Sequence, residues 1–475
     1  ILLMSNISKL LSKNELYSPI ISLSSSIAED LKMDVYLVGG FVRDLLLKKK
    51  LIDIDIMVEG NAEKFARELS KRLKINKVVE FEKFHTYRIP YNDYEIDVAE
   101  ARKETYESNS RKPNTVTSAS ISEDLGRRDF TVNALAISLN KTSYGEIIDP
   151  FKGIQDLNDG VLKTPKDPDI TFSDDPLRML RAIRFAAQLE FKIEKNIIES
   201  ISNQANRIKI ISWERITAEI IKLLKTKKPS IGFYLLKETK LLSYVFPEMD
   251  VMSGVEVIDG KSHKDVFIHT LEVVDNAAKL TDKMEVRFAA LVHDIAKPPT
   301  KKFYKNKGWT FHGHEEIGRR MMKIVAKRMK ISNELRDYLM VLIKLHLRPI
   351  ALAKRNITDK AVRRVMFEAG ELIDDLMILC RADITTKNSA KIKKYLQNFE
   401  RVENLMRDVK TRDEIKAFKC PITGQMIMKE FSLTEGIVVG KIKKDIESAI
   451  LDGKIDNNYD AAFKYMHTIK DKYLH

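Results

Sequence analysis

Residues 35–44 read VYLVGGFVRD, and residues 52–58 follow with IDIDIMV. The first stretch opens with an apolar, partly β-branched run that ends at Gly39 and Gly40, which is typical of a buried strand running into a tight turn. The second stretch alternates acidic and apolar residues in its first half, so it predicts a further strand. Together the two stretches indicate the start of a domain that mixes strands and helices.

The rest of the chain divides into two kinds of segment. Strands are also predicted at 94–98 and 134–139, and a helix capped by Asn61 is predicted at 61–73. From about Asp175 to the end, helical periodicity dominates. The fold class is therefore predicted to be α+β, with a head built on a small β-sheet and helices and an all-helical body behind it. The predicted domains are residues 1–165, 166–250, 251–390 and 391–475.

The composition limits the class of protein. No run of about 18 apolar residues occurs, so no membrane partner is expected. Cys380 and Cys420 are the only cysteines, which argues against a disulfide framework and a cysteine-based zinc site and fits a cytoplasmic location. The net charge of +14 would attract a polyanion such as nucleic acid, although a lysine-rich genome bias explains such a charge equally well.

Two acidic residues on the predicted strand form a candidate metal site. Asp53 and Asp55 are two positions apart, so their carboxylates point to the same face of a strand. Like charges held together repel unless a cation lies between them, and Mg²⁺ prefers such oxygen ligands. Asp97 is a candidate third carboxylate, and together these aspartates would be the catalytic residues of phosphoryl transfer around two metals. An isolated D-x-D is more often a solvated strand edge, but the glycine turn and Arg43 just upstream can approach a phosphate.

Three segments resemble, in order, the motifs of class II CCA-adding enzymes and bacterial poly(A) polymerases. They are residues 37–44 with 53–56, RRDFTVNAL at 127–135, and DDPLRMLRAIRF at 174–185. The resemblance implies that the head is a nucleotidyltransferase domain and that 166–250 is a neck for nucleotide selection. It further implies template-independent addition of CCA to tRNA from CTP and ATP, with Mg²⁺ as the cofactor. A poly(A) polymerase, or an enzyme that adds only CC or only A, has the same fold and is the nearest alternative.

The resemblance also assigns roles to individual residues. Triphosphate and metal contacts are implied for Gly40, Arg43, Asp53 and Asp55. Sugar and phosphate contacts are implied for Arg128, Asp129 and Asn133. The segment at 100–120 resembles a flexible loop that helps to organise the site.

The third motif suggests how a protein selects bases without a template. Asp175 and Pro176 suit the N-cap and the first position of a helix, and a plain cap is the simpler interpretation of such a pair. Cytosine and adenine both present an amino donor beside a ring-nitrogen acceptor, whereas guanine and uracil present the reverse order. An acceptor on Asp175 and a donor on Arg178 can therefore accept C and A and reject G and U, which is the role that the resemblance implies. Arg181 and Arg184 continue a basic stripe and are expected to hold phosphates or neighbouring backbone.

A second group of ligand-type residues lies in the helical body. Its members are His269, His293, Asp294, His314, His346 and Asp383. Their order resembles the HD phosphohydrolase domain between about 265 and 390, and imidazole with carboxylate suits a transition metal. His312 competes with His314 for the third position, and any single histidine is more often a packed core residue. A phosphohydrolase acting on RNA ends or nucleotides is therefore an alternative function, and a non-catalytic RNA-binding protein is another.

The neck and the tail carry weaker signals. Residues 213–216, WERI, together with Glu219 resemble a neck helix that braces the base-reading helix and touches RNA. The tail at 391–475 is basic, and residues 421–441 resemble the family's tail segment, which implies contacts with tRNA phosphates. The sequence predicts no particular oligomeric state.

Overall fold

The computed structural model of the chain describes residues 7–12, 17–51, 53–81, 85–92, 94–106, 113–353, 358–417, 420–451 and 454–474. Two compact units emerge from the contacts within the chain. The first unit comprises residues 1–354 and 365–399, and the second comprises residues 355–364 and 400–475. The α+β fold class is confirmed, whereas the finer division into four domains stays a prediction.

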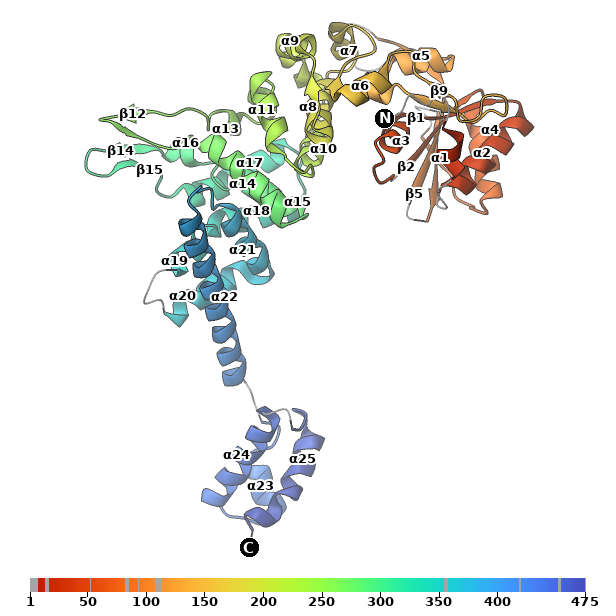
Figure 1. Cartoon of the computed structure of the whole chain (residues 1–475). Helices are drawn as coiled ribbons and strands as arrows, with labels where there is room; N and C mark the ends of the chain where they lie inside the picture. Colours follow the sequence, from red (N-terminus) through yellow and green to blue (C-terminus); the bar gives the residue numbers. More distant parts are fainter. Residues whose placement is uncertain are drawn as a thin grey trace. The chain divides into compact units, whose positions relative to one another are not determined.

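A mixed seven-stranded sheet forms the head, with the strand order β3-β4-β5-β2-β1-β8-β9 (Figure 1). Its strands are β1 (Asp34–Val38), β2 (Asp53–Glu59), β3 (Val79–Phe81), β4 (Thr86–Tyr91), β5 (Tyr94–Glu100), β8 (Ala136–Ser138) and β9 (Ile147–Ile148). β2 pairs in parallel with β5, and this register places Asp55 opposite Asp97. The strand predicted at 134–139 is shorter than expected, because Thr131–Asn133 form a 3-10 turn before it.

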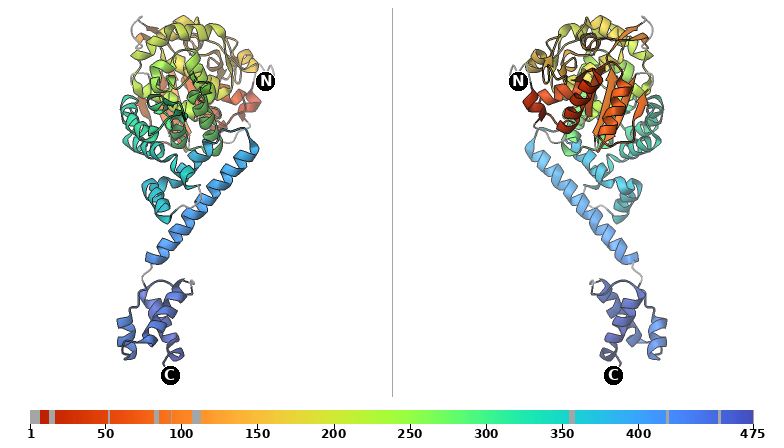
Figure 2. Two further views of the ribbon diagram at one scale, coloured as in Figure 1. Left: turned by 90° about the vertical axis from the view of Figure 1, so that its left-hand side faces the viewer. Right: turned by 90° about the vertical axis from the view of Figure 1, so that its right-hand side faces the viewer.

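The two faces of this sheet have different surroundings. Alternate residues such as Ile54, Ile56 and Ile96 point into the main core, where helices cover them. These helices are α1 (Ser8–Ser12), α2 (Ser18–Leu31), α3 (Gly39–Leu46) and α4 (Ala62–Arg72). In the right view of Figure 2, the red α2 and the orange α4 lie side by side. Asn61 caps α4 as predicted, since its side chain accepts a hydrogen bond from the Lys64 N–H at 2.8 Å.

The opposite face carries the aspartates and a smaller apolar cluster around Tyr36 and Met57. Beside it lie α5 (Ile121–Gly126) and a hairpin of β6 (Arg102–Tyr106) and β7 (Pro113–Ser118). The hairpin occupies the segment that was predicted to be a flexible loop, and residues 107–112 of that segment lie outside the described residues. This face is therefore open to the cleft that is described below.

A neck of helices follows the head. It contains α6 (Gly153–Asp159), α7 (Pro168–Asp174), α8 (Leu177–Leu189), α9 (Lys195–Gln204), α10 (Trp213–Leu224), α11 (Ser230–Glu238), α12 (Leu242–Val245) and α13 (Pro247–Asp250). Helix α8 packs against α10 and α11. One short strand pair, β10 (Val161–Leu162) with β11 (Lys192–Ile193), ties the end of the head to the end of α8.

The helical domain that comes next is not helical throughout. Its helices are α14 (Val266–Leu280), α15 (Met284–Val292), α16 (Lys297–Thr300), α17 (His314–Arg328), α18 (Asn333–Leu345), α19 (Arg348–Leu352), α20 (Asp359–Ala369) and α21 (Ile373–Ala382). Two hairpins project from it (Figure 1), β12 (Val257–Ile258) with β13 (Lys261–Ser262) and β14 (Lys302–Tyr304) with β15 (Gly308–Thr310). They lie at two weak breaks in the helical pattern, where the sequence offered too few alternating residues to predict strands.

Neck and helical domain share several buried contacts. Thr217 of α10 donates a hydrogen bond to the Met329 carbonyl at 2.6 Å. At the end of α17, Arg328 pairs with both oxygens of Glu248 at 2.6 Å, and its guanidinium lies 5.3 Å from the ring of Trp213. The last turn of α17 is therefore fixed to the neck.

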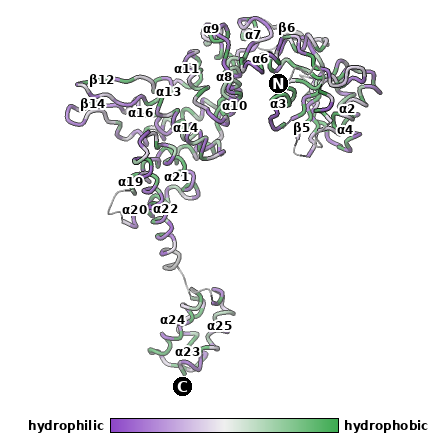
Figure 3. The backbone as a smooth tube through the Cα atoms, in the orientation of Figure 1, coloured by the Kyte–Doolittle hydropathy of each residue, from purple (hydrophilic) through white to green (hydrophobic). Residues whose placement is uncertain are grey.

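The chain ends in α22 (Ser389–Ala417) and three tail helices, α23 (Gly424–Phe431), α24 (Ile437–Leu451) and α25 (Tyr459–Thr468). The tail has its own apolar cluster, which includes Ile427, Ile442 and Met466. Hydrophobic and hydrophilic residues alternate along these helices (Figure 3), as amphipathic helices require. Among the described residues, no helix has the length and apolar character that crossing a membrane would take.

Candidate active sites in the head and in the helical domain

A glycine turn joins β1 to α3 beside the aspartates. Gly39 has φ of +68°, and a Cβ there would lie 2.8 Å from Arg128 Nη1 and 3.4 Å from Asp55 Oδ2. Glycine is needed at this position, because any side chain would strain the backbone and push these two groups away. The sequence pointed to Gly40 as a site residue, and Gly40 does line the cleft, but Gly39 makes the closer approach.

Asp55 is the central carboxylate of the head. Its pKa is raised to about 6, mainly by burial and also by the neighbouring Asp97 and Asp53, against the opposing charge of Arg128. Burial and Glu95 also raise the pKa of Asp53, which lies exposed at the start of β2. Carboxylates whose charged forms are disfavoured in this way fit a divalent cation, which would stabilise those charges.

The third aspartate is held by a partner that the sequence did not reveal. Arg88 on β4 donates to both oxygens of Asp97, at 2.7 and 2.8 Å. Within the described residues, compact groups of three or more metal-ligating side chains occur in the helical domain and do not include the three aspartates of the sheet. The catalytic role of Asp97 therefore stays a prediction, and Arg88 would compete with a metal ion for the negative charge of Asp97.

One cleft of about 550 Å³ joins the first and third motifs. We call it the head cleft. Asp55 lines it on the sheet side, and Asp175 and Arg178 line it on the side of α8. The other predicted nucleotide-binding residues in its lining are Gly40, Arg43, Arg128, Asp129, Asn133, Arg181 and Arg184. Asp53 and Asp97 lie outside this lining.

The base-reading pair is fixed by its surroundings. Asp175 Oδ1 accepts from the Leu177 N–H at 3.0 Å, so Asp175 caps α8 as predicted, although the helix begins one residue later than expected. Its Oδ2 accepts from Arg215 Nη2 of α10, also at 3.0 Å. Arg178 Nη2 donates to the Arg127 carbonyl at 2.7 Å. Cap and base reader are thus compatible roles, since both side chains keep unused hydrogen-bonding capacity in the cleft.

The other two arginines of the stripe pair with carboxylates. Arg181 lies 2.6 Å from Asp129, and Arg184 lies 2.5 Å from the buried Glu219 of α10. The ring of Phe185 lies beneath both guanidinium groups, at 5.4 and 3.9 Å. The expectation that they hold phosphates or backbone stays a prediction, and each of the two charges already has an acidic partner.

A continuous hydrogen-bonded chain links the glycine turn to α8. Arg43 Nη1 donates to Asn133 Oδ1 at 2.7 Å, and Asn133 Nδ2 donates to Asp129 Oδ1 at 3.0 Å. Burial would raise the pKa of Asp129, but Arg181 and Asn133 outweigh burial and hold it below its usual range. The carboxylate that ends the chain therefore stays ionised and fixes α8 against the second motif.

All six predicted ligands of the helical domain converge. We call them the histidine site. They form two groups, His269 with His293 and Asp383, and Asp294 with His314 and His346, and the ligand atoms of each group lie within 4.8 Å of one another. His269 Nε2 lies 3.0 Å from Asp383 Oδ1, and His293 Nε2 lies 3.1 Å from Asp294 Oδ2. His312 is exposed and does not belong to either group, so His314 takes the third position.

Each imidazole of the histidine site is oriented by a contact at Nδ1, the ring nitrogen that points away from the centre of the site. The Nδ1 atoms of three histidines lie 2.7–2.8 Å from backbone carbonyl oxygens, and His269 Nδ1 lies 3.1 Å from the Thr385 hydroxyl. Such contacts leave Nε2 free to face inward and are typical of metal-binding histidines. Burial lowers the pKa of His346 to about 4, so its ring is neutral at neutral pH, which is the form that binds metals.

One buried atom supports this assignment. Within the described residues, His293 Nε2 is buried and makes no well-aligned hydrogen bond, although Asp294 Oδ2 lies 3.1 Å away. A buried nitrogen that faces carboxylates and imidazoles in this way is placed to bind a cation. The donor set of nitrogen and oxygen suits a transition metal better than Mg²⁺.

Comparison with known proteins gives matches for the head, the neck and the helical domain. Residues 35–163 match the model of the poly A polymerase head domain, residues 190–252 match that of the probable RNA and SrmB-binding site of polymerase A, and residues 266–388 match that of the HD domain. The chain is 32% identical over 382 residues to the multifunctional CCA protein of Shewanella frigidimarina, which covers 77% of this chain and 87% of the relative. It is 36% identical over 315 residues to that of Psychromonas ingrahamii, which covers 64% and 72%.

The chain belongs to the CCA-adding enzyme and poly(A) polymerase family.

Solved structures of CCA-adding enzymes have the same fold. A tRNA nucleotidyltransferase with a primer tRNA and an incoming ATP analogue is 27% identical, with a TM-score of 0.57, and covers 80% of this chain and 99% of that one. A CCA-adding enzyme without ligand has a TM-score of 0.60 at 24% identity and covers 98% of both chains, which shows the fold.

In this member of the CCA-adding enzyme family, some site residues escaped sequence reasoning. Arg88 contacts Asp97 across neighbouring strands, which only the register reveals, and Asp124 pairs with Arg128 four residues later in the chain. Gly39 makes the closest approach to Asp55 and Arg128, although the sequence pointed to Gly40. Lys297 lies 2.5 Å from Asp294 and could have been found, because it follows Asp294 by three residues, as neighbours on one helical turn do. The bracing role predicted for the neck is borne out by the contacts of Arg215 and Glu219 with α8.

Proposed function

We propose that the protein adds C, C and A to the 3′ end of tRNA from CTP and ATP. The observation that carries this proposal is the single cleft that holds both Asp55 and the Asp175–Arg178 pair. In the reaction, the terminal 3′-hydroxyl attacks the α-phosphorus of the nucleotide, the bond to the β-phosphate breaks, and pyrophosphate leaves. Asp53 and Asp55 would hold Mg²⁺, which neutralises charge on the phosphates when it is bound.

Base choice follows from the arrangement of the pair. An amino group of cytosine or adenine can donate to Asp175, while the adjacent ring nitrogen accepts from Arg178. Arg215 and the Leu177 N–H fix the carboxylate, so it cannot turn to suit another base. Guanine and uracil would set a carbonyl oxygen against the carboxylate and an N–H against the guanidinium, which leaves both unsatisfied.

An assay with one nucleotide at a time tests this function. Full-length protein is incubated with Mg²⁺ and tRNA that lacks its CCA, together with each labelled nucleoside triphosphate. Addition of two C and then one A, followed by a stop, supports the proposal. Long A tails would instead indicate a poly(A) polymerase, and addition of C alone or A alone would indicate one of the partial enzymes.

A second activity is favoured by the histidine site. We propose that it binds a transition metal and hydrolyses phosphate esters on RNA ends or nucleotides. The four aimed imidazoles and the buried His293 nitrogen support it. A bound metal would supply a nucleophilic hydroxide at neutral pH, and His269, His293, Asp294, His314, His346 and Asp383 would hold it.

Metal content and phosphate release test the second activity together. The purified protein is loaded with Mn²⁺, Co²⁺, Ni²⁺ or Zn²⁺ and dialysed, and the retained metal is measured by elemental analysis. Release of phosphate from a tRNA with a 3′-phosphate is then followed. His293→Ala should lose retained metal and hydrolysis while CCA addition continues. A wild-type protein that retains none of these metals would contradict the assignment.

The tail and the cellular location belong to the same proposal. Contacts between the lysines of the tail helices and tRNA phosphates would weaken as salt is raised. Action on tRNA agrees with the cytoplasmic location predicted from the cysteines.

A further inference from the structure

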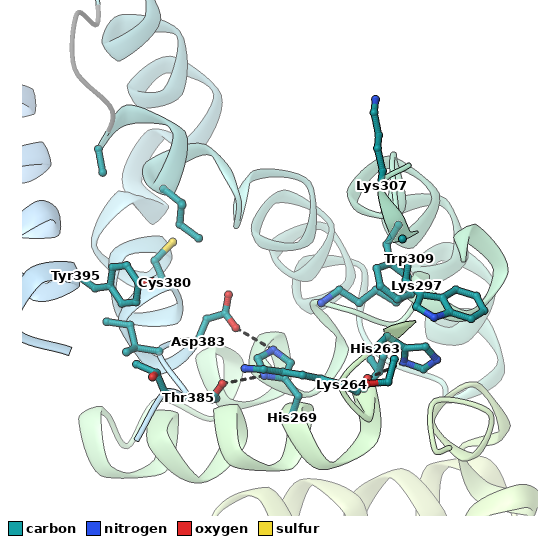
Figure 4. Close-up of a pocket in the computed structure, with 18 of the residues that line it drawn as sticks. His263, Lys264, His269, Lys297, Lys307, Trp309, Cys380, Asp383, Thr385 and Tyr395 are labelled. Carbon is teal, nitrogen blue, oxygen red and sulfur yellow. Dashed lines mark hydrogen bonds and ion pairs between the residues drawn. The ribbon is translucent and has the colours of Figure 1, made fainter. Parts of the chain in front are cut away.

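A large pocket opens beside the histidine site. It has a volume of about 970 Å³ and reaches His269 and Asp383 at its base. Figure 4 shows Trp309 and His263 on one side of these two residues and Tyr395 on the other. The first side comes from the two hairpins, and the second comes from α22. A pocket of this size accepts a small ligand, and the metal ligands occupy only part of its lining.

The hairpin side of the pocket is a fixed aromatic surface. Trp309 Nε1 donates to the Lys261 carbonyl at 3.0 Å, which sets the orientation of the indole. Its ring meets the rings of Phe303 and His263 edge-on, each with centroids 5.2 Å apart. His263 also meets Phe311 edge-on, with centroids 6.0 Å apart. Such edge-to-face contacts hold the aromatic rings in place. Lys301 Nζ lies over the Trp309 ring, 5.4 Å from its centroid, so a base would stack on the face that Lys301 does not cover.

His263 contributes to this surface as a ring and not as a ligand. Its Nδ1 lies 2.8 Å from the Lys264 carbonyl oxygen, and its Nε2 accepts from the Glu256 N–H at 3.3 Å. A carbonyl oxygen can only accept, so Nδ1 carries the proton and Nε2 does not. Both nitrogens are therefore engaged in hydrogen bonds, and the imidazole is not available to a metal.

The pocket also carries lysines. Its lining includes Lys261, Lys264, Lys297 and Lys307 together with the carboxylate of Asp383, and Lys297 is paired with Asp294 at 2.5 Å. In Figure 4, Lys297 and Lys264 extend toward the space above His269 and Asp383, whereas Lys307 points away. Cations close to a site for phosphate hydrolysis favour an anionic substrate, and an aromatic surface beside them favours a flat, uncharged group on the same molecule.

We propose that Trp309 and His263 form a stacking surface for the base of a nucleotide whose phosphate lies at the histidine site. The ligand class is a nucleoside phosphate, either free or at the 3′ end of an RNA. This inference rests on the phosphohydrolase activity proposed above and adds the residues that select its substrate. Stacking tolerates any base, so the surface distinguishes nucleotides from phosphates without a base and does not read sequence.

Binding is measured first, independently of hydrolysis. The chain has two tryptophans, so Trp213→Phe leaves Trp309 as the fluorescent reporter. In EDTA and again with Zn²⁺, adenosine 3′-monophosphate should quench this fluorescence, and ribose 5-phosphate should not. An RNA hairpin that ends in a 3′-phosphate distinguishes the two possible ligands, a free nucleotide and the 3′ end of an RNA. Tighter quenching by the hairpin identifies an RNA end and equal quenching a free nucleotide, and both support the surface. No quenching by either ligand under both conditions overturns it.

Steady-state kinetics on the metal-loaded protein then distinguish the contribution of Trp309 from that of Tyr395 on the opposite side of the pocket. Trp309→Leu should lower kcat/KM for the nucleotide about tenfold, mainly through KM, and leave ribose 5-phosphate unaffected. Trp309→Phe should keep most of the preference. Tyr395→Leu is the matched control on the opposite wall and should change both substrates alike. A selective loss in Tyr395→Leu and none in Trp309→Leu would overturn the inference. A protein that hydrolyses neither substrate refutes the phosphohydrolase, and the quenching result then decides the stacking surface alone.

Discussion

The head cleft and the histidine site hold their acidic residues in opposite ways. In the histidine site, six ligands from separate helices converge, and each imidazole is aimed by a contact at its other nitrogen. In the head, the aspartates follow adjacent strands, and one of them is bound by Arg88. The first arrangement is complete before a metal arrives. The second needs further ligands, and triphosphate oxygens are the ligands that Mg²⁺ commonly takes in addition to one or two carboxylates.

The comparison also predicts how each site responds to the substitution of its residues. A preformed metal site depends on every ligand and on the contacts that orient them. A site that the substrate completes depends most on the sheet carboxylate that lines the cleft, which here is Asp55. The predictions below test this difference.

Loss of the central carboxylates should have the largest effect. Asp55→Asn is expected to lower the rate of C addition by about a thousandfold or more, because the charge that binds Mg²⁺ disappears. Phosphate release at the histidine site should stay within about twofold of the wild type. Single-turnover addition to a tRNA lacking CCA measures the rate of C addition, and hydrolysis of a 3′-phosphate measures the rate of phosphate release.

Asp294→Asn is the reciprocal variant. It should abolish metal retention and hydrolysis while C addition remains near the wild-type rate. If either variant impaired both activities equally, the two sites would not be independent.

Base choice should depend on the residue that fixes Asp175. Arg215→Ala removes the contact at Oδ2, so the carboxylate gains freedom to turn and the preference for C and A over U and G should fall about tenfold to a hundredfold. The measurement is kcat/KM for each nucleotide with the same tRNA. Arg215→Lys should rescue part of the preference, because it restores the charge without the planar fork. An unchanged preference with a uniformly lower rate would show that Arg215 acts on stability only.

Mg²⁺ binding in the head should depend on pH. Burial raises the pKa of Asp55 to about 6, so the protonated, non-binding form dominates below that pH. Apparent Mg²⁺ affinity should fall about tenfold between pH 7 and pH 5, since ionisation of one such group changes by that factor. The folded state holds more protons on Asp55 than the unfolded state does between about pH 4 and 6, so this residue alone favours folding as the pH falls.

Titration of Mg²⁺-dependent addition at each pH measures this fall, with Asp55→Glu as the comparison. A flat profile would mean that bound Mg²⁺ already keeps Asp55 ionised over the whole range.

The smallest effect is expected at the competing arginine. Arg88→Ala frees Asp97, so the Mg²⁺ concentration for half-maximal addition should fall by about twofold to fivefold. Arg67→Ala, an exposed arginine of α4 paired with Glu63, is the matched control and should leave it unchanged. A higher Mg²⁺ requirement in Arg88→Ala would indicate that Arg88 supports the site.

Much of this could be read from the residues alone. The spacing of Asp53 and Asp55 predicted their shared face, since side chains alternate along a strand. The order of the six ligand-type residues predicted that they would converge, whereas the base-reading role of Asp175 and Arg178 stays a prediction. These features are local or rest on a specific combination of motifs.

Other features could not be predicted, for physical reasons. The pairing of Arg88 with Asp97 depends on strand register, which the local pattern does not define. The carboxylates that engage Arg181 and Arg184 come from distant segments, so their charges appeared free in the sequence. The hairpins were missed because their strands have only two or three residues and little alternation.

Helix α17 runs from the histidine site to the neck. Its first residue, His314, belongs to the histidine site, and its last residue, Arg328, lies over Trp213, two positions before the arginine that fixes Asp175. Its 15 residues span about 22 Å at the usual rise of an α-helix. If both proposed activities act on one RNA end, a single terminal nucleotide would not bridge that length, and the end would leave one site before it enters the other. Phosphate hydrolysis and nucleotide addition on one RNA 3′ end would therefore be consecutive events, and the RNA end would move by at least the length of this helix between them.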